Sequence, residues 1–147
     1  MTDELRERTI RATTEDPMEH DSGVITHTKF RIWLRPDGIV QVVLTSRATM
    51  VLEDVIAALE AMAQLTGGRR SPLLMDLHDV SPQDRSVRME FARRGDLVSA
   101  VALIVDTPLS RVMGNLFINV SRPPMPTRLF DNEASALAWL LEFVGRQ

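Results

Sequence analysis

The sequence predicts an α/β protein in which a mixed, mostly parallel five-stranded sheet is flanked by helices, in the order ββαβαβαβα. Nearly continuous apolar runs at 73–77 and 98–105 are typical of strands that are buried on both faces. The segments between them place apolar residues every three or four positions, as amphipathic helices do. Because strands that alternate with helices need crossover connections, the later strands are expected to be parallel.

A hairpin is expected to form the antiparallel edge of this sheet. Residues 25–34 alternate in hydropathy in their second half and predict the first strand, and residues 39–44 predict the returning strand. The sequence Pro36-Asp37-Gly38 lies between them. It predicts a turn, because Pro presets φ and Gly accepts a positive φ.

Each expected helix has signals at its ends. Ser, Thr, Asp and Asn side chains accept hydrogen bonds from the first N–H groups of a helix, Pro suits the first turn, and Gly suits the residue after the last turn. In chain order the signals are Thr49 and Gly67 for the first helix, Ser81-Pro82 and Gly95 for the second, Thr107-Pro108 and Pro123 for the third, and Asp131 or Asn132 for a last helix through Val144. A short strand at 127–130 is expected before that last helix.

Length and composition are those of a single globular domain. The chain has 147 residues, of which 44% are hydrophobic and 25% charged. The absence of cysteine excludes disulfides, thiol catalysis and iron–sulfur clusters, and neither a metal nor another cofactor is expected. The formal net charge of -3 gives no support to nucleic acid as a partner.

The first 22 residues differ from the rest of the chain. They contain seven acidic and three basic side chains and few large apolar ones. We therefore expect residues 1–22 to be a flexible acidic leader and residues 23–147 to be the folded domain. The leader lacks the apolar core of a secretory signal, and no apolar run reaches the roughly 18 residues that span a bilayer. A cytoplasmic protein without a membrane span is expected.

Polar side chains gather where the run at 73–77 ends and the next helix begins. Ligands of α/β sheets bind at the carboxyl ends of strands, and a helix N-terminus favours anions. This surface is a candidate for interaction with a protein partner or for modification, with Ser81 or Ser86 accepting phosphate. The alternative is that these side chains only cap the helix. The candidate residues are His78, Asp79, Ser81, Asp84, Arg85, Ser86 and Arg88.

The last two helices carry more apolar side chains than one face of a sheet covers. The third helix is expected to turn a single apolar stripe toward the core, and the last is apolar nearly all round. We expect a homodimer contact, or a pocket for a small apolar ligand between these two helices, unless the sheet edge and the leader cover the excess. The candidate residues are Met113, Phe117, Ile118, Trp139 and Phe143; the expected stripe comprises Leu109, Val112, Met113, Leu116, Phe117 and Val120.

No catalytic motif is recognisable. Ser81, His78 and Asp79 are neighbours in the sequence, but the chain has no Gly-x-Ser-x-Gly elbow that would present a nucleophile. The histidines also lack the spacing of a catalytic metal site. The chain is therefore expected not to be an enzyme.

Two segments of the sequence resemble the SpoIIAA-like superfamily. Residues 76–80, Asp-Leu-His-Asp-Val, followed by residues 84–87, Asp-Arg-Ser-Val, resemble the Asp-Leu-Ser-x-Val and Asp-Ser-Ser-Gly-Leu pattern of STAS domains, which include anti-sigma-factor antagonists. Residues 126–130 followed by 136–140 resemble the ends of small uncharacterised bacterial members of this superfamily. The resemblance runs from about Val24 onward and implies a SpoIIAA-like (STAS-like) fold. Lipid-binding SEC14-like domains belong to the same superfamily.

The sequence departs from the antagonists at their phosphorylation site. In those proteins a kinase phosphorylates the first Ser of Asp-Ser-Ser-Gly, whereas here Arg85 occupies that position and Val87 replaces the Gly. We therefore expect a non-catalytic regulatory or protein-interaction domain that lacks the usual phosphoacceptor. The alternative, which the SEC14-like relatives imply, is a binder or carrier of a small apolar ligand or lipid.

Overall fold

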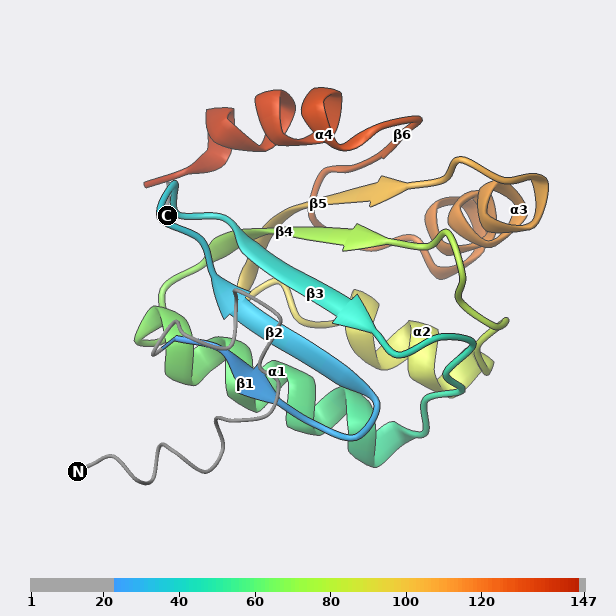
Figure 1. Ribbon diagram of the computed structural model, residues 1–147, viewed down its shortest axis with the longest axis horizontal. Coiled ribbons are helices and arrows are strands. Elements are labelled where there is room, and N and C mark those ends of the chain that lie inside the picture. Colours follow the sequence, from blue (N-terminus) through green and yellow to red (C-terminus); the bar gives the residue numbers. More distant parts are fainter. Residues whose placement is uncertain (1–22, 146–147) are drawn as a thin grey trace.

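The computed structural model describes residues 23–145, which fold into three layers, with a sheet between one helix on one face and three helices on the other (Figure 1). The leader expected at residues 1–22 lies outside the described residues. The elements are β1 (Ile25–Thr26), β2 (Phe30–Leu34), β3 (Val40–Leu44), α1 (Leu52–Thr66), β4 (Ser71–Asp76), α2 (Arg85–Ala92), β5 (Val98–Ile104), α3 (Pro108–Leu116), the π-helical turn η2 (Phe117–Ser121), β6 (Thr127–Phe130), α4 (Glu133–Leu140) and the 3₁₀ turn η3 (Leu141–Phe143).

The sheet confirms the predicted fold class. Within the described residues its strands lie in the order β1-β2-β3-β4-β5-β6. The pairs β1/β2 and β2/β3 are antiparallel, and the pairs β3/β4, β4/β5 and β5/β6 are parallel. The hairpin thus forms one edge, and the crossover helices connect the parallel strands, as the alternation of strands and helices requires.

The first expected strand is divided into β1 and β2, which adds a strand to the five predicted. The His27 N–H donates to the Phe30 carbonyl oxygen (2.8 Å), and the Lys29 N–H donates to the Nδ1 atom of His27 (3.1 Å). These local bonds close a tight turn inside the segment 25–34. A side chain that bonds to its own backbone competes with strand pairing, and this accounts for the break.

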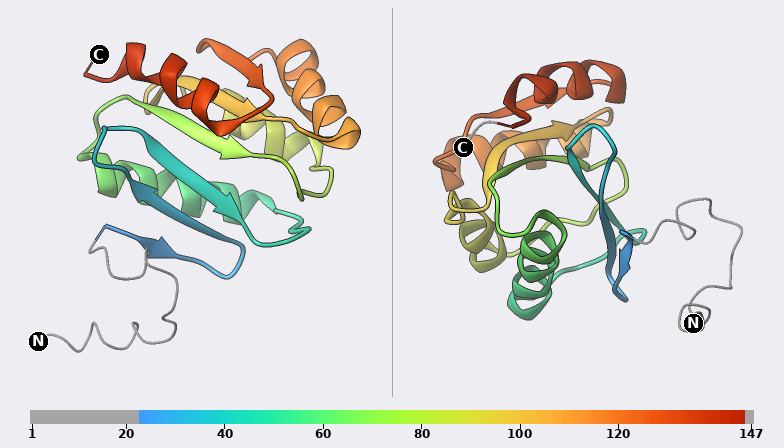
Figure 2. Two further views of the ribbon diagram at one scale, coloured as in Figure 1. Left: turned by 45° about the horizontal axis from the view of Figure 1, so that its top comes forward. Right: turned by 90° about the vertical axis from the view of Figure 1, so that its left-hand side faces the viewer.

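Helices cover both faces of the sheet, and each face has its own apolar layer (Figure 2). Helices α1, α2 and α3 lie over one face, where the buried residues include Phe30, Ile32, Leu59, Met62, Leu73 and Val101. Helix α4 crosses the other face, where Ile39, Leu74, Ala100, Ala102, Ile104, Ala136 and Leu140 are buried. All seven residues of β5 are buried, as its unbroken apolar sequence predicts.

The predicted starts of the last two helices are confirmed, and those of the first two are wrong. Thr107 Oγ1 accepts from the Ser110 N–H (3.1 Å), and Asn132 Oδ1 accepts from the Ser135 N–H (2.9 Å). Helix α1 instead begins after Val51, whose N–H donates to the Asp54 carboxylate (2.9 Å).

Helix α2 begins at Arg85, four residues after the predicted cap Ser81, and ends at Ala92 rather than at Gly95. The hydroxyl of Ser81 donates to the Arg47 carbonyl oxygen (3.0 Å), so it does not cap the helix. The segment before Arg85 is instead bonded to the loop that follows β3, and Asp84 has an extended backbone.

Helix α3 packs through its small residues, and this corrects the single stripe predicted for it. Ser110 and Gly114 are buried, and a Cβ atom on Gly114 would lie 2.7 Å from Leu129 Cδ2 and 3.0 Å from Val105 Cγ1. The helix thus approaches the sheet too closely for larger side chains at these positions. The stripe divides: Met113 and Phe117 face the core, whereas the exposed side carries Leu109, Val112, Leu116 and Val120.

No helix among residues 23–145 is both long enough and apolar enough to cross a membrane.

Gly38, in the β2–β3 turn, lies against Val144, and replacing this glycine tests the contact. Its φ is +90°, and an added Cβ atom would lie 2.7 Å from Val144 Cγ1. We expect Gly38→Ala to lower the free energy of unfolding by about 2–3 kcal/mol, from backbone strain plus overpacking. The matched control is Gly67→Ala, where φ is +68° and no atom lies within 4 Å, so that strain alone costs about 1 kcal/mol. Equal losses in urea unfolding of the two variants would contradict the contact with Val144.

Candidate functional site

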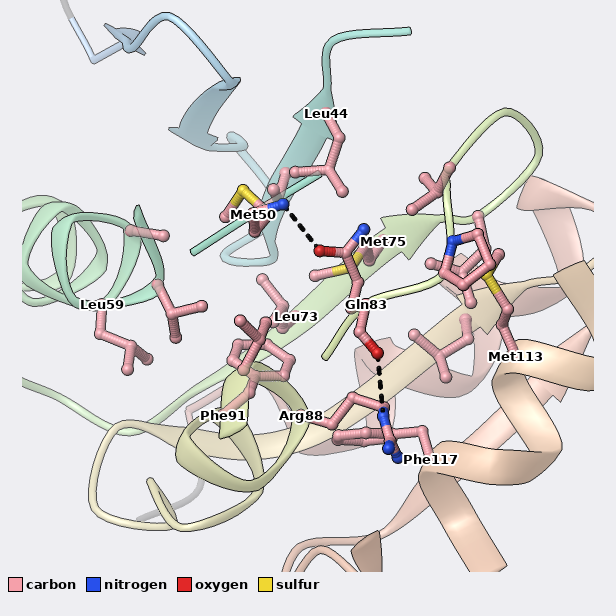
Figure 3. Close-up of a pocket in the computed structure, with 18 of the residues that line it drawn as sticks. Leu44, Met50, Leu59, Leu73, Met75, Gln83, Arg88, Phe91, Met113 and Phe117 are labelled. Atoms are coloured by element: carbon pink, nitrogen blue, oxygen red, sulfur yellow. Dashed lines mark hydrogen bonds between the residues drawn. The ribbon is translucent and has the colours of Figure 1, made fainter. Parts of the chain in front are cut away.

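An apolar cavity of about 140 Å³ lies between the sheet and helices α1, α2 and α3 (Figure 3). It is partly open to solvent. Strands β2 to β5 form its floor, and the residues that follow β4 form part of its wall. The cavity therefore lies within the larger of the two apolar layers, on the face opposite α4.

The lining of this cavity is almost entirely apolar. All of its residues are hydrocarbon or thioether side chains except Gln83 and Arg88. Four are methionines, namely Met50, Met62, Met75 and Met113, which come from four different parts of the chain. Methionine is unbranched and adapts its shape to irregular neighbours, so this lining can accommodate ligands of more than one shape.

Gln83 connects two segments that border the cavity. Its Oε1 atom accepts from the Met50 N–H (2.8 Å), and its Nε2 atom donates to the carbonyl oxygens of Ala48 (3.0 Å) and Ser81 (2.6 Å). The Arg47 N–H also donates to the Asp79 carbonyl oxygen (2.8 Å). These bonds hold the loop after β3 against the loop after β4, so the wall of the cavity is fixed by polar contacts.

Arg88 is the only charged side chain in the lining. Its Nε atom donates to the Gln83 carbonyl oxygen at 3.4 Å, a long bond (Figure 3). Its Nη1 atom is buried and has no hydrogen-bond partner among the described residues. Buried donors are nearly always paired in folded proteins, so this atom is an exception in the site.

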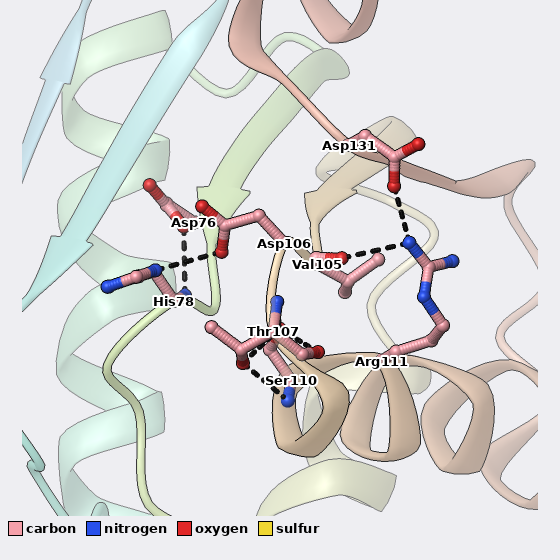
Figure 4. A network of polar contacts seen from close by, with 8 residues as sticks. All are labelled: Asp76, His78, Val105, Asp106, Thr107, Ser110, Arg111 and Asp131. Carbon is pink, nitrogen blue, oxygen red and sulfur yellow. Dashed lines mark hydrogen bonds and ion pairs between the residues drawn. The ribbon is translucent and has the colours of Figure 1, made fainter.

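A second polar group lies at the carboxyl ends of β4 and β5 (Figure 4). The His78 N–H donates to Asp76 Oδ1 (2.9 Å), and His78 Nδ1 lies 2.9 Å from Asp106 Oδ1. The hydrogen bond with Asp106 raises the pKa of His78 above its ordinary value, and the negative charges of Asp106, Asp76 and Asp79 act in the same direction. Arg111 donates to the Val105 carbonyl oxygen (3.1 Å) and pairs with Asp131.

This polar group is bonded within itself. Asp79 accepts from the Ser46 hydroxyl, and Thr107 and Ser110 bond to one another at the start of α3. Within residues 23–145 no group of three or more His, Asp or Glu side chains is arranged to hold a metal ion. The group at the strand ends therefore fastens loops to each other.

The structure separates the residues of the predicted interaction surface. His78, Asp79 and Ser81 bond to neighbouring loops. Asp84, Arg85 and Ser86 are exposed at the start of α2. Arg88 is only partly exposed and lines the apolar cavity.

The five predicted apolar candidates also lie in different places. Met113 and Phe117 line the cavity, and Ile118 is half-buried on η2. Trp139 and Phe143 pack on the opposite face of the sheet, with ring centroids 4.9 Å apart. The pocket expected between the last two helices is therefore wrong in location, because α3 and α4 lie on opposite faces. The spacing of Val87, Arg88 and Phe91 could have placed Arg88 beside the apolar side of α2, but it gave no signal of the cavity itself.

Comparison with solved structures identifies the fold class. An uncharacterised protein of the DUF3478 family from Shewanella loihica PV-4, described as having a SpoIIAA-like fold, is 17% identical and aligns over 80% of this chain and 94% of its own, with a TM-score of 0.55. A protein with unknown function from Arthrobacter sp. FB24 is 31% identical over 82% of this chain and 98% of its own, with a TM-score of 0.30. The fold of the present chain is thus SpoIIAA-like, as its resemblance implied.

The family follows from the sequence itself. The model of the family described as "Domain of unknown function (DUF7793)" matches residues 32–144, so the chain belongs to this family. No protein of curated function matches the chain.

The His78–Asp106 contact predicts a measurable titration. Because the pKa of His78 is raised, the ion pair contributes fully below the unfolded-state pKa of histidine, and its contribution is lost as the pH rises through the folded-state value. We expect Asp106→Asn to lower the His78 midpoint in an NMR titration of the ring protons. Asp131→Asn, which removes the partner of Arg111, is the control and should leave that midpoint unchanged. A midpoint that is the same in wild type and Asp106→Asn would contradict the contact.

Proposed function

We propose that this chain is a non-catalytic binder of a small apolar ligand, which it holds in the cavity between the sheet and helices α1, α2 and α3. The observation that carries the proposal is the cavity itself, whose lining is apolar except for Gln83 and Arg88. Cavities of this kind bind ligands by removing apolar surface from water. This was the alternative to a regulatory domain in the sequence analysis, and the geometry favours it.

The size of the cavity limits the ligand. An apolar cavity of about 150 Å³ holds one benzene molecule, so the present cavity of about 140 Å³ suits a ligand core of about six carbon atoms. Movement of the four lining methionines would admit a longer chain. Burying a methylene group contributes about 0.8 kcal/mol, so a six-carbon neutral ligand should bind with a Kd of about 0.1–1 mM.

The bonds of Gln83 also support a binding role. They fasten the loop after β3 to the loop after β4 through three backbone groups, and this holds that wall of the cavity in place before a ligand arrives. A preformed site avoids the cost of ordering loops on binding.

A second candidate function is interaction with a protein partner, and we propose a second copy of this chain as that partner. The exposed stripe of α3 and η2 favours it. Its members are Leu109, Val112, Leu116 and Val120, and Val112 is 63% exposed. The stripe carries no charge, so two copies can meet around a twofold axis without repulsion.

Filling the cavity tests ligand binding. Ala58 lines the cavity from α1, and Ala58→Phe would place a ring in the space that a six-carbon ligand needs. We expect hexan-1-ol to shift the ¹³C-methyl NMR signals of the four lining methionines in wild type, and to leave them unchanged in Ala58→Phe. The signal of Met125, which is buried outside the lining, should not move in either protein.

Ile56→Phe is the matched control, because Ile56 is exposed on the same helix and outside the lining. It should bind hexan-1-ol as wild type does. Saturable binding that survives Ala58→Phe, or no shift of the lining methionines in wild type, would refute the proposed site.

The proposed dimer can be tested by measuring the molecular mass in solution. Light scattering at about 100 µM protein should give twice the 16.5 kDa mass of the chain for wild type, and Val112→Glu should give a single chain, because a desolvated charge at the contact is costly. Asn115→Glu, which is exposed on α3 outside the stripe, should leave the dimer intact. A wild-type mass of one chain would rule out the dimer.

A further inference from the structure

We propose that Arg88 holds the head group of the cavity's ligand, and that this ligand is a short amphiphilic carboxylate with its apolar tail among the lining methionines. The inference rests on the proposed function and goes beyond it, because it assigns the ligand a charge and assigns one residue the recognition of that charge.

The first observation is the unpartnered donor. The Nη1 atom of Arg88 is buried and lacks a hydrogen-bond partner among the described residues, while Nε has only the long bond to the Gln83 carbonyl oxygen. A guanidinium keeps its charge at every physiological pH and has no acceptor. An acceptor from outside the protein is therefore the natural complement of this atom.

The second observation is that the other polar side chain of the lining does not serve as this acceptor. The amide group of Gln83 already bonds to Met50, Ala48 and Ser81, and its two donors and its oxygen are all engaged. Rotating it toward Arg88 would break the contacts that hold the cavity wall.

The third observation concerns charge. No Asp or Glu lines the cavity, so no acidic side chain of the lining neutralises Arg88. A single cation beside an apolar cavity is matched by a single negative charge. A carboxylate supplies one charge in a planar group that matches the guanidinium, whereas a phosphate monoester would bring close to two charges to one arginine.

The fourth observation is the position of the charge beside an apolar volume. Arg88 and the four lining methionines border the same cavity of about 140 Å³. A ligand that satisfies both has an anionic head and about six carbon atoms of tail, and hexanoate is the simplest example. The neutral analogue hexan-1-ol shares the tail and lacks the charge.

Isothermal titration calorimetry with hexanoate and hexan-1-ol tests the inference on the full chain. Hexan-1-ol offers Arg88 a hydroxyl acceptor but no negative charge, whereas a carboxylate pairs with the guanidinium through charge and two oxygens. If that difference contributes about 1.5–3 kcal/mol, wild type should bind hexanoate roughly 10- to 100-fold more tightly than hexan-1-ol. Hexanoate should also shift the Arg88 Nε–Hε NMR signal more strongly than hexan-1-ol does. This comparison needs no variant.

Arg88→Met removes the charge and keeps an apolar side chain of similar reach. Its affinity for hexanoate should fall about 10- to 100-fold, to the level of hexan-1-ol, while its affinity for hexan-1-ol stays within about threefold of wild type. The control is Arg85→Met, which removes an exposed arginine from the same helix and should change neither affinity. Circular dichroism verifies that both variants are folded.

The outcomes separate the two proposals. If wild type binds hexan-1-ol as tightly as hexanoate, or if Arg88→Met keeps the hexanoate affinity, the role of Arg88 is wrong and the apolar binding function stands. If neither compound binds wild type, both proposals are wrong. Loss of hexanoate preference in Arg85→Met as well as in Arg88→Met would attribute it to the general charge of α2 and overturn the assignment to Arg88.

Discussion

Strands β4 and β5 are buried on both faces, and their burial requires that helices cover both sides of the sheet. Every residue of β5 and the first four residues of β4 are buried. Leaving such a surface exposed would cost about 25 cal/mol for each Å² of apolar area. One helix, α4, therefore covers one face, and α1, α2 and α3 share the other, where the cavity lies at their junction.

Helix α3 packs closely on the sheet, and this determines where its larger apolar side chains lie. Because Ser110 and Gly114 face the sheet, α3 lies close to β6 and to the residue that follows β5, and its larger apolar residues lie on its sides. Met113 borders the cavity, whereas Val112 is exposed. The small residues Ser110 and Gly114 thus contribute both to the cavity and to the exposed apolar stripe. The two proposed binding functions therefore depend on the same packing of α3.

The sequence predicted the fold class because its signals are local. The apolar run at 98–105 and the caps at Thr107 and Asn132 depend on near neighbours in the chain, and all are observed. The start of α2 could not be predicted, because Ser81 and Gln83 bond to residues more than 30 positions away. The cavity escaped prediction for a similar reason, since its lining comes from distant elements and a hydropathy pattern does not distinguish a filled core from a hollow one.

Arg88 affects both the stability of the unliganded protein and its selectivity among ligands. An unpartnered buried donor costs about 1–3 kcal/mol, a large part of the 5–15 kcal/mol that stabilises a typical domain. An apolar residue at this position of α2 would remove that cost and would fit the surrounding methionines. A carboxylate recovers this cost on binding through a charged pair with the guanidinium, whereas an alcohol offers only a neutral hydroxyl acceptor and recovers less of it. The atom that weakens the unliganded protein is therefore the one that distinguishes an acid from an alcohol of equal length.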